Sequence, residues 1–296
     1  MKCLDRQGNV IADNEAQNKS LDFLYKTTIG NAILKVLIKP TISEIAGKFL
    51  DSKLSTVLIK SFVKNNNIDL SDFEDVKYNS FNEFFTRKVK KEKRIVSFEP
   101  TDLVSPCDSR LSVYDITNDG VFTVKNTKYT MTELFRSEKI AKHYEGGKLL
   151  ICRLTVSDYH RYHIIDDGVL SKHYKIKGFF HTVNPIANDY TKIYKENTRE
   201  FSILKSDNFG NVAIMEVGAL LVGRILNYHA NEKHLVKRGN EKGRFEFGGS
   251  TVILAFEKDK VQIDEDILKA SEDGYEIHVN QGEVIGKKFL KNKKSC

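Results

Sequence analysis

A serine that follows two glycines near the C-terminal end of the chain, in residues 243–252, has an arrangement that permits unusual backbone chemistry. Gly248 and Gly249 allow a tight or strained backbone just before Ser250. Such a tetrapeptide, Gly-Gly-Ser-Thr, is by itself typical of a hairpin turn. Its chemical interpretation is an N-to-O acyl shift, in which the Ser250 hydroxyl attacks the Gly249 carbonyl and forms an ester. A β-elimination would then break the chain, and loss of ammonia would convert the new terminal residue into a pyruvoyl group.

Two histidines, His160 and His163, lie three residues apart in a polar stretch. Histidine is the side chain best suited to proton transfer near neutral pH. A histidine pair is also typical of metal ligands, but no third ligand follows at a characteristic spacing. The sequence therefore favours proton transfer here and predicts no metal site.

An aspartate, Asp108, follows a proline and precedes a strand-like run. In isolation it is typical of a turn residue that hydrogen-bonds to its own backbone. Together with a histidine and a serine it could orient an imidazole, as in a Ser-His-Asp triad, because such triads are defined by geometry and not by chain order. The neighbouring Cys107 is interpreted as a small buried residue and not as a nucleophile.

The elements that must position these side chains divide the chain into two regions. From Leu21 onward apolar residues recur at helical spacing, which predicts a helix ending before Pro40, followed by helices over 42–49 and 54–63. Residues 1–95 are therefore predicted to form a helical N-terminal region. Its helices either pack on the rest of the protein or lie in a membrane interface, and the sequence leaves both open.

After Pro100 the pattern changes to short runs of β-branched and aromatic residues divided by glycine turns. One helix is expected over 132–142. Strands are expected over 111–116, 121–124, 149–154, 179–183, 212–217, 251–256 and 275–279. Residues 96–296 are thus predicted to be a mostly antiparallel β core, and the fold class is α+β.

The composition is that of an ordinary globular protein of 296 residues with a net charge of +7. This excess favours acidic partners, either nucleic acid or anionic lipid headgroups. The four cysteines are dispersed, which favours a reducing compartment. No secretory signal and no apolar stretch long enough to cross a bilayer are visible, so any membrane contact is expected to be peripheral.

Three stretches in combination, Ser-Pro-Cys-Asp at 105–108, Asp-Tyr-His-Arg-Tyr-His at 158–163 and Gly-Gly-Ser-Thr at 248–251, resemble the phosphatidylserine decarboxylase family. Phe-Asn-Glu-Phe-Phe-Thr-Arg at 81–87 and the glycine-flanked apolar run 217–223 match in order and approximate spacing. The resemblance covers roughly residue 75 to the C-terminus.

The resemblance implies that the precursor cuts itself between Gly249 and Ser250, giving a large chain 1–249 and a small chain 250–296. It implies a triad of Asp108, His163 and Ser250, in which His163 is the base and Asp108 sets its tautomer. It places His160 near the substrate carboxylate.

The activity implied by the resemblance is decarboxylation of phosphatidylserine to phosphatidylethanolamine and carbon dioxide. The cofactor would be the pyruvoyl group derived from Ser250, which forms a Schiff base with the substrate amine, and neither pyridoxal phosphate nor a metal would be required. The expected location is peripheral, on the cytoplasmic face of the cell membrane, where the enzyme meets phosphatidylserine in an anionic bilayer. The large and small chains would remain together, a homo-oligomer is possible and no nucleic acid is expected.

Three alternatives remain open at this point. A pyruvoyl decarboxylase of a soluble amino acid would share the chemistry. A basic nucleic-acid-binding module would explain the charge, although no zinc-finger, RNP or helix-turn-helix signature is present. A homologue that folds but never cuts itself would retain the motifs.

Overall fold

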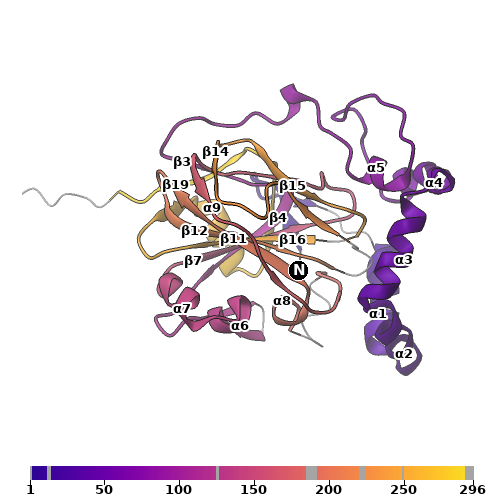
Figure 1. Ribbon diagram of the computed structural model, residues 1–296, viewed down its shortest axis with the longest axis horizontal. Helices are drawn as coiled ribbons and strands as arrows, with labels where there is room; N and C mark the ends of the chain where they lie inside the picture. The colour runs from indigo at the N-terminus through magenta and orange to yellow at the C-terminus, as the bar shows by residue number, and fades with distance from the viewer. Residues whose placement is uncertain are drawn as a thin grey trace, which may run out of the picture.

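The computed structural model describes residues 2–11, 15–124, 127–184, 192–219, 224–248 and 250–290. Most of the longer helices lie in the first hundred residues, and strands in mostly antiparallel sheets predominate in the rest of the chain (Figure 1). The predicted α+β class is confirmed.

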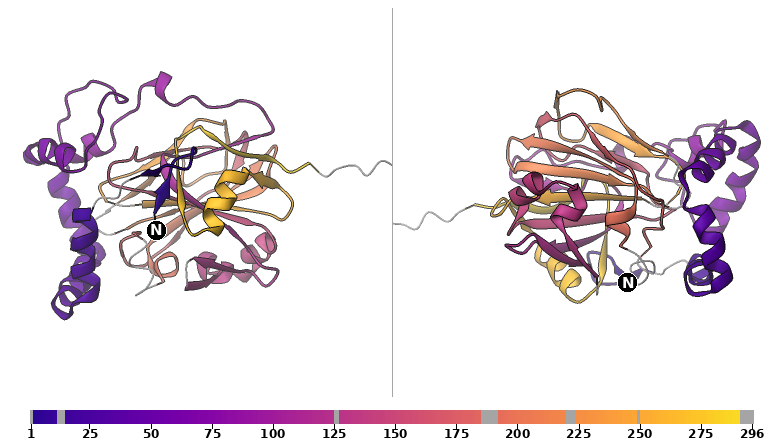
Figure 2. Two further views of the ribbon diagram at one scale, coloured as in Figure 1. Left: turned by 180° about the vertical axis from the view of Figure 1, so that it is seen from behind. Right: turned by 60° about the horizontal axis from the view of Figure 1, so that its bottom comes forward.

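Four helices form a layer along one side of the molecule, which we call the helical layer (Figures 1 and 2). They are α1 (Glu15–Lys26), α2 (Thr28–Leu37), α3 (Pro40–Leu50) and α4 (Val57–Asn65), with a 3-10 turn η1 (Lys53–Thr56) between the last two. The short helix α5 (Phe81–Phe85) lies against the end of this layer. Helices were expected over 42–49 and 54–63, and α3 and α4 are found there.

The single helix predicted to run from Leu21 to before Pro40 is wrong, because the chain forms two helices there. Thr27 has extended backbone angles, and its side chain accepts a hydrogen bond from Gly30 N–H at the start of α2. Gly30 also lies so close to α1 that a Cβ would stand 2.0 Å from the Phe23 carbonyl oxygen. Apolar periodicity continues across this corner, so it could not reveal the break.

The main sheet has β16 near its centre, between β12 and β7, and every residue of β16 is buried. Its pairs are antiparallel except for β1 with β18. In spatial order the strands are β14 (His234–Val236), β9 (Gly168–Leu170), β11 (Arg199–Ser206), β12 (Gly210–Val217), β16 (Ser250–Phe256), β7 (Lys148–Leu154), β4 (Ser109–Asp115), β18 (Glu276–Val279), β1 (Cys3–Leu4) and β2 (Val10–Ile11), with β10 (Tyr174–Ile176) beside β11.

Smaller sheets and helices surround the main sheet. The strands are β13 (Ile225–Asn227), β15 (Glu241–Phe245) and β8 (Arg161–His163) in one sheet, β17 (Val261–Ile263), β19 (Val284–Lys288) and β3 (Asp102–Val104) in another, and the pair β5 (Val121–Val124) and β6 (Thr127–Thr130). The helices are α6 (Met131–Phe135), α7 (Glu138–Ala141), α8 (Ile193–Glu196) and α9 (Glu265–Glu272), with 3-10 turns η2 (Lys91–Lys93) and η3 (Lys142–Tyr144).

Two further predictions need correction. The helix expected over 132–142 is split into α6 and α7, because Arg136 adopts a left-handed conformation (φ 50°) and Ser137 caps the next helix through Ile140 N–H. The strand expected over 179–183 is reduced to one isolated bridge between Phe179 and Asn197. The other predicted strands overlap with observed ones.

Apolar side chains form a large cluster on each side of the main sheet, and Leu21, Tyr25 and Leu34 of the helical layer join one of them. The first described residues also belong to the core, since β1 and β2 extend the main sheet beside α9 (Figure 2). Within the described residues, no helix combines the length and apolar character needed to cross a bilayer.

Candidate active site

Strand pairing places Ser250 at a fixed point in the core. It is the first residue of β16, it is fully buried, and its register partner is Leu154 at the end of β7. The loop that leaves β7 therefore passes next to the serine. Gly248 has φ 129°, a conformation that favours glycine, whereas Gly249 lies outside the described residues.

His160 is the histidine that contacts Ser250. Its Nδ1 is 3.5 Å from Ser250 Oγ, a long separation for a hydrogen bond, and its Nε2 is 3.0 Å from the Thr155 carbonyl oxygen. Because a carbonyl can only accept, Nε2 carries the proton and Nδ1 presents its lone pair to the serine hydroxyl. Burial, with the nearby Arg87 cation, lowers the pKa of His160 to about 3, so the imidazole is neutral at physiological pH.

The loop before His160 is held by its own turn and by the ring of Phe85. Asp158 Oδ2 accepts from Thr155 N–H at 2.6 Å, and Asp158 N–H donates to the Thr155 carbonyl at 3.1 Å. The Phe85 ring stacks on the His160 imidazole with 4.0 Å between centroids. These contacts fix the imidazole orientation that the contact with Ser250 requires.

His163 lies next to the bend that carries Asp108. His163 is in β8, and its N–H donates to the carbonyl of Pro106, two residues before Asp108, at 2.8 Å. Burial lowers the pKa of His163 to about 4, and its Nδ1 has no hydrogen-bond partner in the described part of the chain. Among the described residues, no hydrogen bond joins His163 to Ser250 or to Asp108.

Asp108 is instead held by a cation and a backbone amide. Arg94 donates from Nε to Oδ1 at 2.8 Å and from Nη2 to Oδ2 at 2.6 Å, and Gln281 N–H donates to Oδ1 at 2.8 Å. Sequence reasoning missed Arg94, which follows a lysine-rich run without a motif of its own. It also assigned no role to Gln281.

Arg87 is a buried cation whose position sequence reasoning left without a role. Its guanidinium lies over the rings of Phe73 (4.1 Å) and Phe84 (5.1 Å), and Nη2 donates to the Ser157 carbonyl at 2.7 Å. Its Nε and Nη1 have no partner in the described structure. Arg87 thus ties the segment after α5 to the loop that carries His160, and its place in the motif 81–87 was the available signal.

The residues just upstream of Ser250 are anchored to α5 and the helical layer. Phe247 packs edge-on against Phe81, with 5.0 Å between centroids, and its N–H donates to Asn82 Oδ1 at 3.2 Å. Arg224 bridges Asp51 at the end of α3 and Glu246. The helical layer is therefore mechanically connected to the segment that leads into β16.

Three buried polar atoms, on His163 and on the residues that follow Asp108 and Ser250, have no hydrogen-bond partner in the described chain: His163 Nδ1, Ser109 Oγ and Thr251 Oγ1. Buried polar groups are normally paired, so this arrangement fits a site that receives a further polar group. The residues described include no cluster of three or more His, Cys, Asp or Glu arranged to hold a metal ion. Cys107 is fully buried, and burial raises its thiol pKa well above the ordinary value, which argues against a nucleophilic role.

Comparison with known proteins identifies the family of this chain. The sequence profile of the phosphatidylserine decarboxylase family matches residues 81–287. The chain is 45% identical over 275 residues to phosphatidylserine decarboxylase proenzyme 2 of Clostridium acetobutylicum, covering 93% of this chain and 94% of the relative. It is 47% identical over 278 residues to the phosphatidylserine decarboxylase proenzyme of Clostridium tetani, covering 92% of each. The chain belongs to the phosphatidylserine decarboxylase family.

Proposed function

We propose that this protein is a self-processing decarboxylase that converts phosphatidylserine to phosphatidylethanolamine and carbon dioxide with a pyruvoyl group made from Ser250. Membership of the family supports the reaction. The single observation that supports the site is the buried Ser250 hydroxyl, which faces the unprotonated Nδ1 of a neutral His160.

Processing begins when the Ser250 hydroxyl loses its proton to a base and Oγ attacks the carbonyl carbon of Gly249. The Oγ–C bond forms, the C–N bond breaks and the amide nitrogen takes up a proton, which leaves an ester and a free amine. Removal of the Ser250 Cα proton then expels the carboxylate of Gly249 as the Cβ–Oγ bond breaks. The resulting enamine tautomerises to an imine, and water replaces the nitrogen, which leaves as ammonia.

In this proposal His163 is the base, Asp108 is its partner, and His160 holds the hydroxyl in place before cleavage. In this proposal the His163 side chain moves to reach Oγ, and within the described residues no hydrogen bond holds its Nδ1 back. Both imidazoles are neutral above about pH 4 because burial lowers their pKa values to about 3 and about 4. Neutral imidazoles are the form that accepts a proton.

The fully buried position of Ser250 beside His160, in a part of the core with unpartnered polar atoms, fits a pyruvoyl group at this point of β16. When formed, this group supplies an electron-accepting carbonyl conjugated to the bond that loses carbon dioxide. The chain itself excludes water from the site. In this proposal His160, whose ring is ordered by Phe85 and the Thr155 carbonyl, lies near the substrate carboxylate during decarboxylation.

A peripheral position on the cytoplasmic face of the membrane is part of the same proposal. The helical layer exposes large apolar side chains, among them Ile29 (70% exposed), Ile45 (62%), Leu54 (74%) and Val57 (76%). Exposed lysines such as Lys35 and Lys60 accompany them. Apolar side chains with neighbouring cations are the pattern that binds an anionic lipid surface.

The experiment that tests the proposal follows chain cleavage and phosphatidylserine turnover in three variants. Ser250→Ala is expected to stay whole and inactive. His163→Ala is expected to stay whole. His160→Ala is expected to lose less of its self-cleavage than of its phosphatidylserine turnover, each relative to the wild type. If His160→Ala stays whole and His163→Ala cuts, the two roles are exchanged.

Matched controls are available elsewhere in the chain. Ser202 is fully buried with an unpartnered Oγ, and both ring nitrogens of His173 lack partners among the described residues. Ser202→Ala and His173→Ala should therefore cut like the wild type. If they fail to cut as Ser250→Ala does, general loss of the fold explains the effect and the assignment to Ser250 is wrong.

A further inference from the structure

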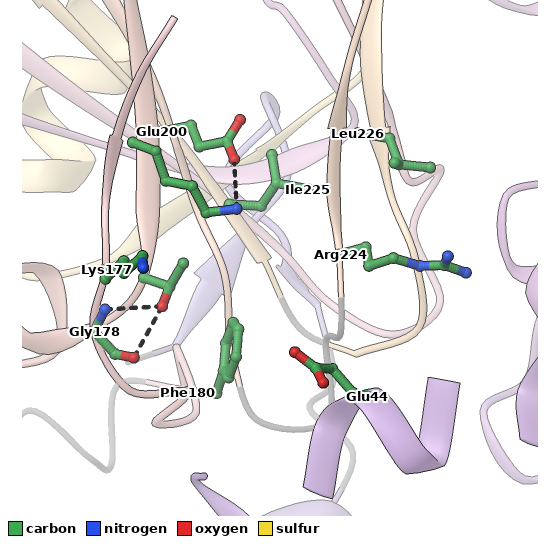
Figure 3. Close-up of a pocket in the computed structure, with 10 residues that line it drawn as sticks. Glu44, Lys177, Gly178, Phe180, Glu200, Arg224, Ile225 and Leu226 are labelled. Atoms are coloured by element: carbon green, nitrogen blue, oxygen red, sulfur yellow. Dashed lines mark hydrogen bonds and ion pairs between the residues drawn. The ribbon is translucent and has the colours of Figure 1, made fainter. Parts of the chain in front are cut away.

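A cavity of about 510 Å³ opens between the helical layer and the β core (Figure 3). One wall is formed by the chain that runs from β10 to Phe180, and the opposite wall by Ile225 and Leu226 of β13. Glu44 of α3 projects toward it from the helical layer. Its size falls in the range of about 300–1,000 Å³ that is usual for small-molecule sites.

The cavity lies at the end of the main sheet where Ser250 stands. Its Phe180 ring is packed so closely on Gly218 that a Cβ there would meet Phe180 Cε1 at 2.9 Å. Gly218 directly follows Val217, whose register partner is Thr251. The first wall therefore contacts Gly218, which is one residue beyond the pairing of β12 with β16, the strand that begins with Ser250.

The second wall is connected to the segment that precedes Ser250. Arg224, which lines the cavity, accepts a hydrogen bond on its carbonyl from Glu246 N–H at 3.1 Å, and its Nε binds the Glu246 carboxylate at 2.5 Å. Glu246 stands four residues before Ser250. A molecule in the cavity is thus flanked on two sides by the segments that position the reacting residue.

Of the charged side chains that line the cavity, one carboxylate, Glu44, and one cation, Lys177, are outside the ion pairs of the described residues. Lys175 pairs with Glu200 at 3.2 Å, and Arg224 is occupied by Glu246 and Asp51. Lys177 makes no ion pair or hydrogen bond with any described residue.

Apolar side chains complete the lining next to this free cation, namely Phe180, Ile225 and Leu226. A cation beside an apolar wall suits a ligand that is anionic at one end and apolar at the other.

We propose that this cavity binds the glycerophosphate portion of the phospholipid, with the phosphodiester on Lys177 and the glycerol and first acyl carbons against Ile225 and Leu226. The proposal rests on the proposed function, because it assigns the lipid part of that substrate. The acyl chains leave the cavity on the side of the helical layer, whose exposed apolar face continues into the bilayer. The serine headgroup then extends toward Ser250.

Binding can be measured without turnover. The chain contains no tryptophan, so Phe179→Trp places a single fluorophore at the rim, where Phe179 is 49% exposed and does not fill the cavity. The probe is monomeric dihexanoyl phosphatidylglycerol, an anionic phosphodiester without an amine. A saturable change in emission is expected, and adding Lys177→Glu should weaken binding by about tenfold.

The matched control is Lys205→Glu, the same charge change at an exposed lysine near the far end of β11. It should bind the probe as the parent does. In chains that retain Phe179, Lys177→Glu should raise KM for dihexanoyl phosphatidylserine about tenfold while self-cleavage continues at the normal rate.

The outcomes separate this inference from the function on which it rests. If the protein cuts itself and turns over substrate, but Lys177→Glu and Lys205→Glu bind and react alike, the cavity assignment is wrong and the function stands. If the protein is uncut and inactive but binds the probe, and Lys177→Glu weakens that binding, the lipid site stands and the proposed decarboxylase function is wrong. Absence of a saturable signal together with an unchanged KM in Lys177→Glu also overturns the site.

Discussion

The helical layer and the β core differ in which side chains they expose and which they bury. In the helical layer large apolar residues such as Leu54 and Val57 are exposed. In the core, several charged residues are buried in ion pairs, and the clearest case is Lys242 with Glu216 at 2.7 Å, with side chains 1% and 0% exposed. The helical layer thus has an apolar surface suited to a lipid partner. The β core holds charged side chains in fixed, buried ion pairs.

The two regions are joined by α5. Its Phe81 packs on Phe62 of α4 on one side and on Phe247 on the other, with ring centroids 5.0 Å apart in both cases. A contact between the helical layer and a membrane would therefore act next to the segment that precedes Ser250. Changes made in each region should separate docking from processing.

The largest effect is expected from breaking the buried pair in the core. Lys242→Met leaves the Glu216 carboxylate buried without its cation, which should lower the free energy of unfolding by about 3–5 kcal/mol. Denaturant unfolding measures this loss. Lys205→Met, at an exposed position, should change stability by about 0.5 kcal/mol at most, and equal losses in both variants would contradict the contrast between core and surface.

A smaller effect is expected where α5 meets the catalytic loop. Arg87→Met removes the donor to the Ser157 carbonyl and should slow self-cleavage by about tenfold or more. Because a nearby cation disfavours protonated imidazole, the same change should raise the pKa of His160. The acid side of the pH profile of cleavage should then move to higher pH.

A purely structural role for Arg87 would slow cleavage without moving this pH profile. Arg87→Lys keeps the charge and loses the planar donor group. It should therefore keep the acid limb of the profile near its wild-type position while still cutting slowly. A profile that shifts equally in both variants would rule out the electrostatic part of the account.

Substitutions in the helical layer should weaken membrane binding and leave self-cleavage unchanged. The double change Leu54→Glu and Val57→Glu removes two exposed apolar side chains and should weaken binding to phosphatidylserine vesicles by about tenfold or more. Vesicle sedimentation measures this binding. Val10→Glu, an exposed position (66%) on β2, is the control, and an equal loss of binding there would contradict docking through the helical layer.

The smallest effect concerns pH in the wild type. The pKa values of His160 and His163 are lowered by burial to about 3 and about 4, so neither gains a proton between pH 8 and pH 6. The cleavage rate should therefore be nearly constant over this interval and fall only as the pH approaches 4. A decline centred near pH 6.5 would show that the catalytic imidazoles titrate as exposed histidines do.

Local sequence patterns were sufficient for the class of the fold and for part of the site. Glycine spacing and strand patterns predicted a strand at 251–256, and strand pairing places its neighbour Ser250 beside the loop that carries His160. The break at Thr27 comes from a cap and a close backbone approach within residues 23–30, which apolar periodicity does not register, whereas residues near 180 pack on the distant Gly218. The Arg94 and Gln281 contacts to Asp108 join residues up to 173 positions apart, and no local pattern encodes such pairs.

The central claim is that the bond before Ser250 breaks without help from another protein. Intact mass spectrometry of freshly purified wild-type protein tests it most directly. The account predicts two chains, residues 1–249 and residues 250–296, the smaller one beginning with pyruvoyl in place of serine, while Ser250→Ala remains a single chain. Wild-type protein that stays whole under native conditions would contradict it.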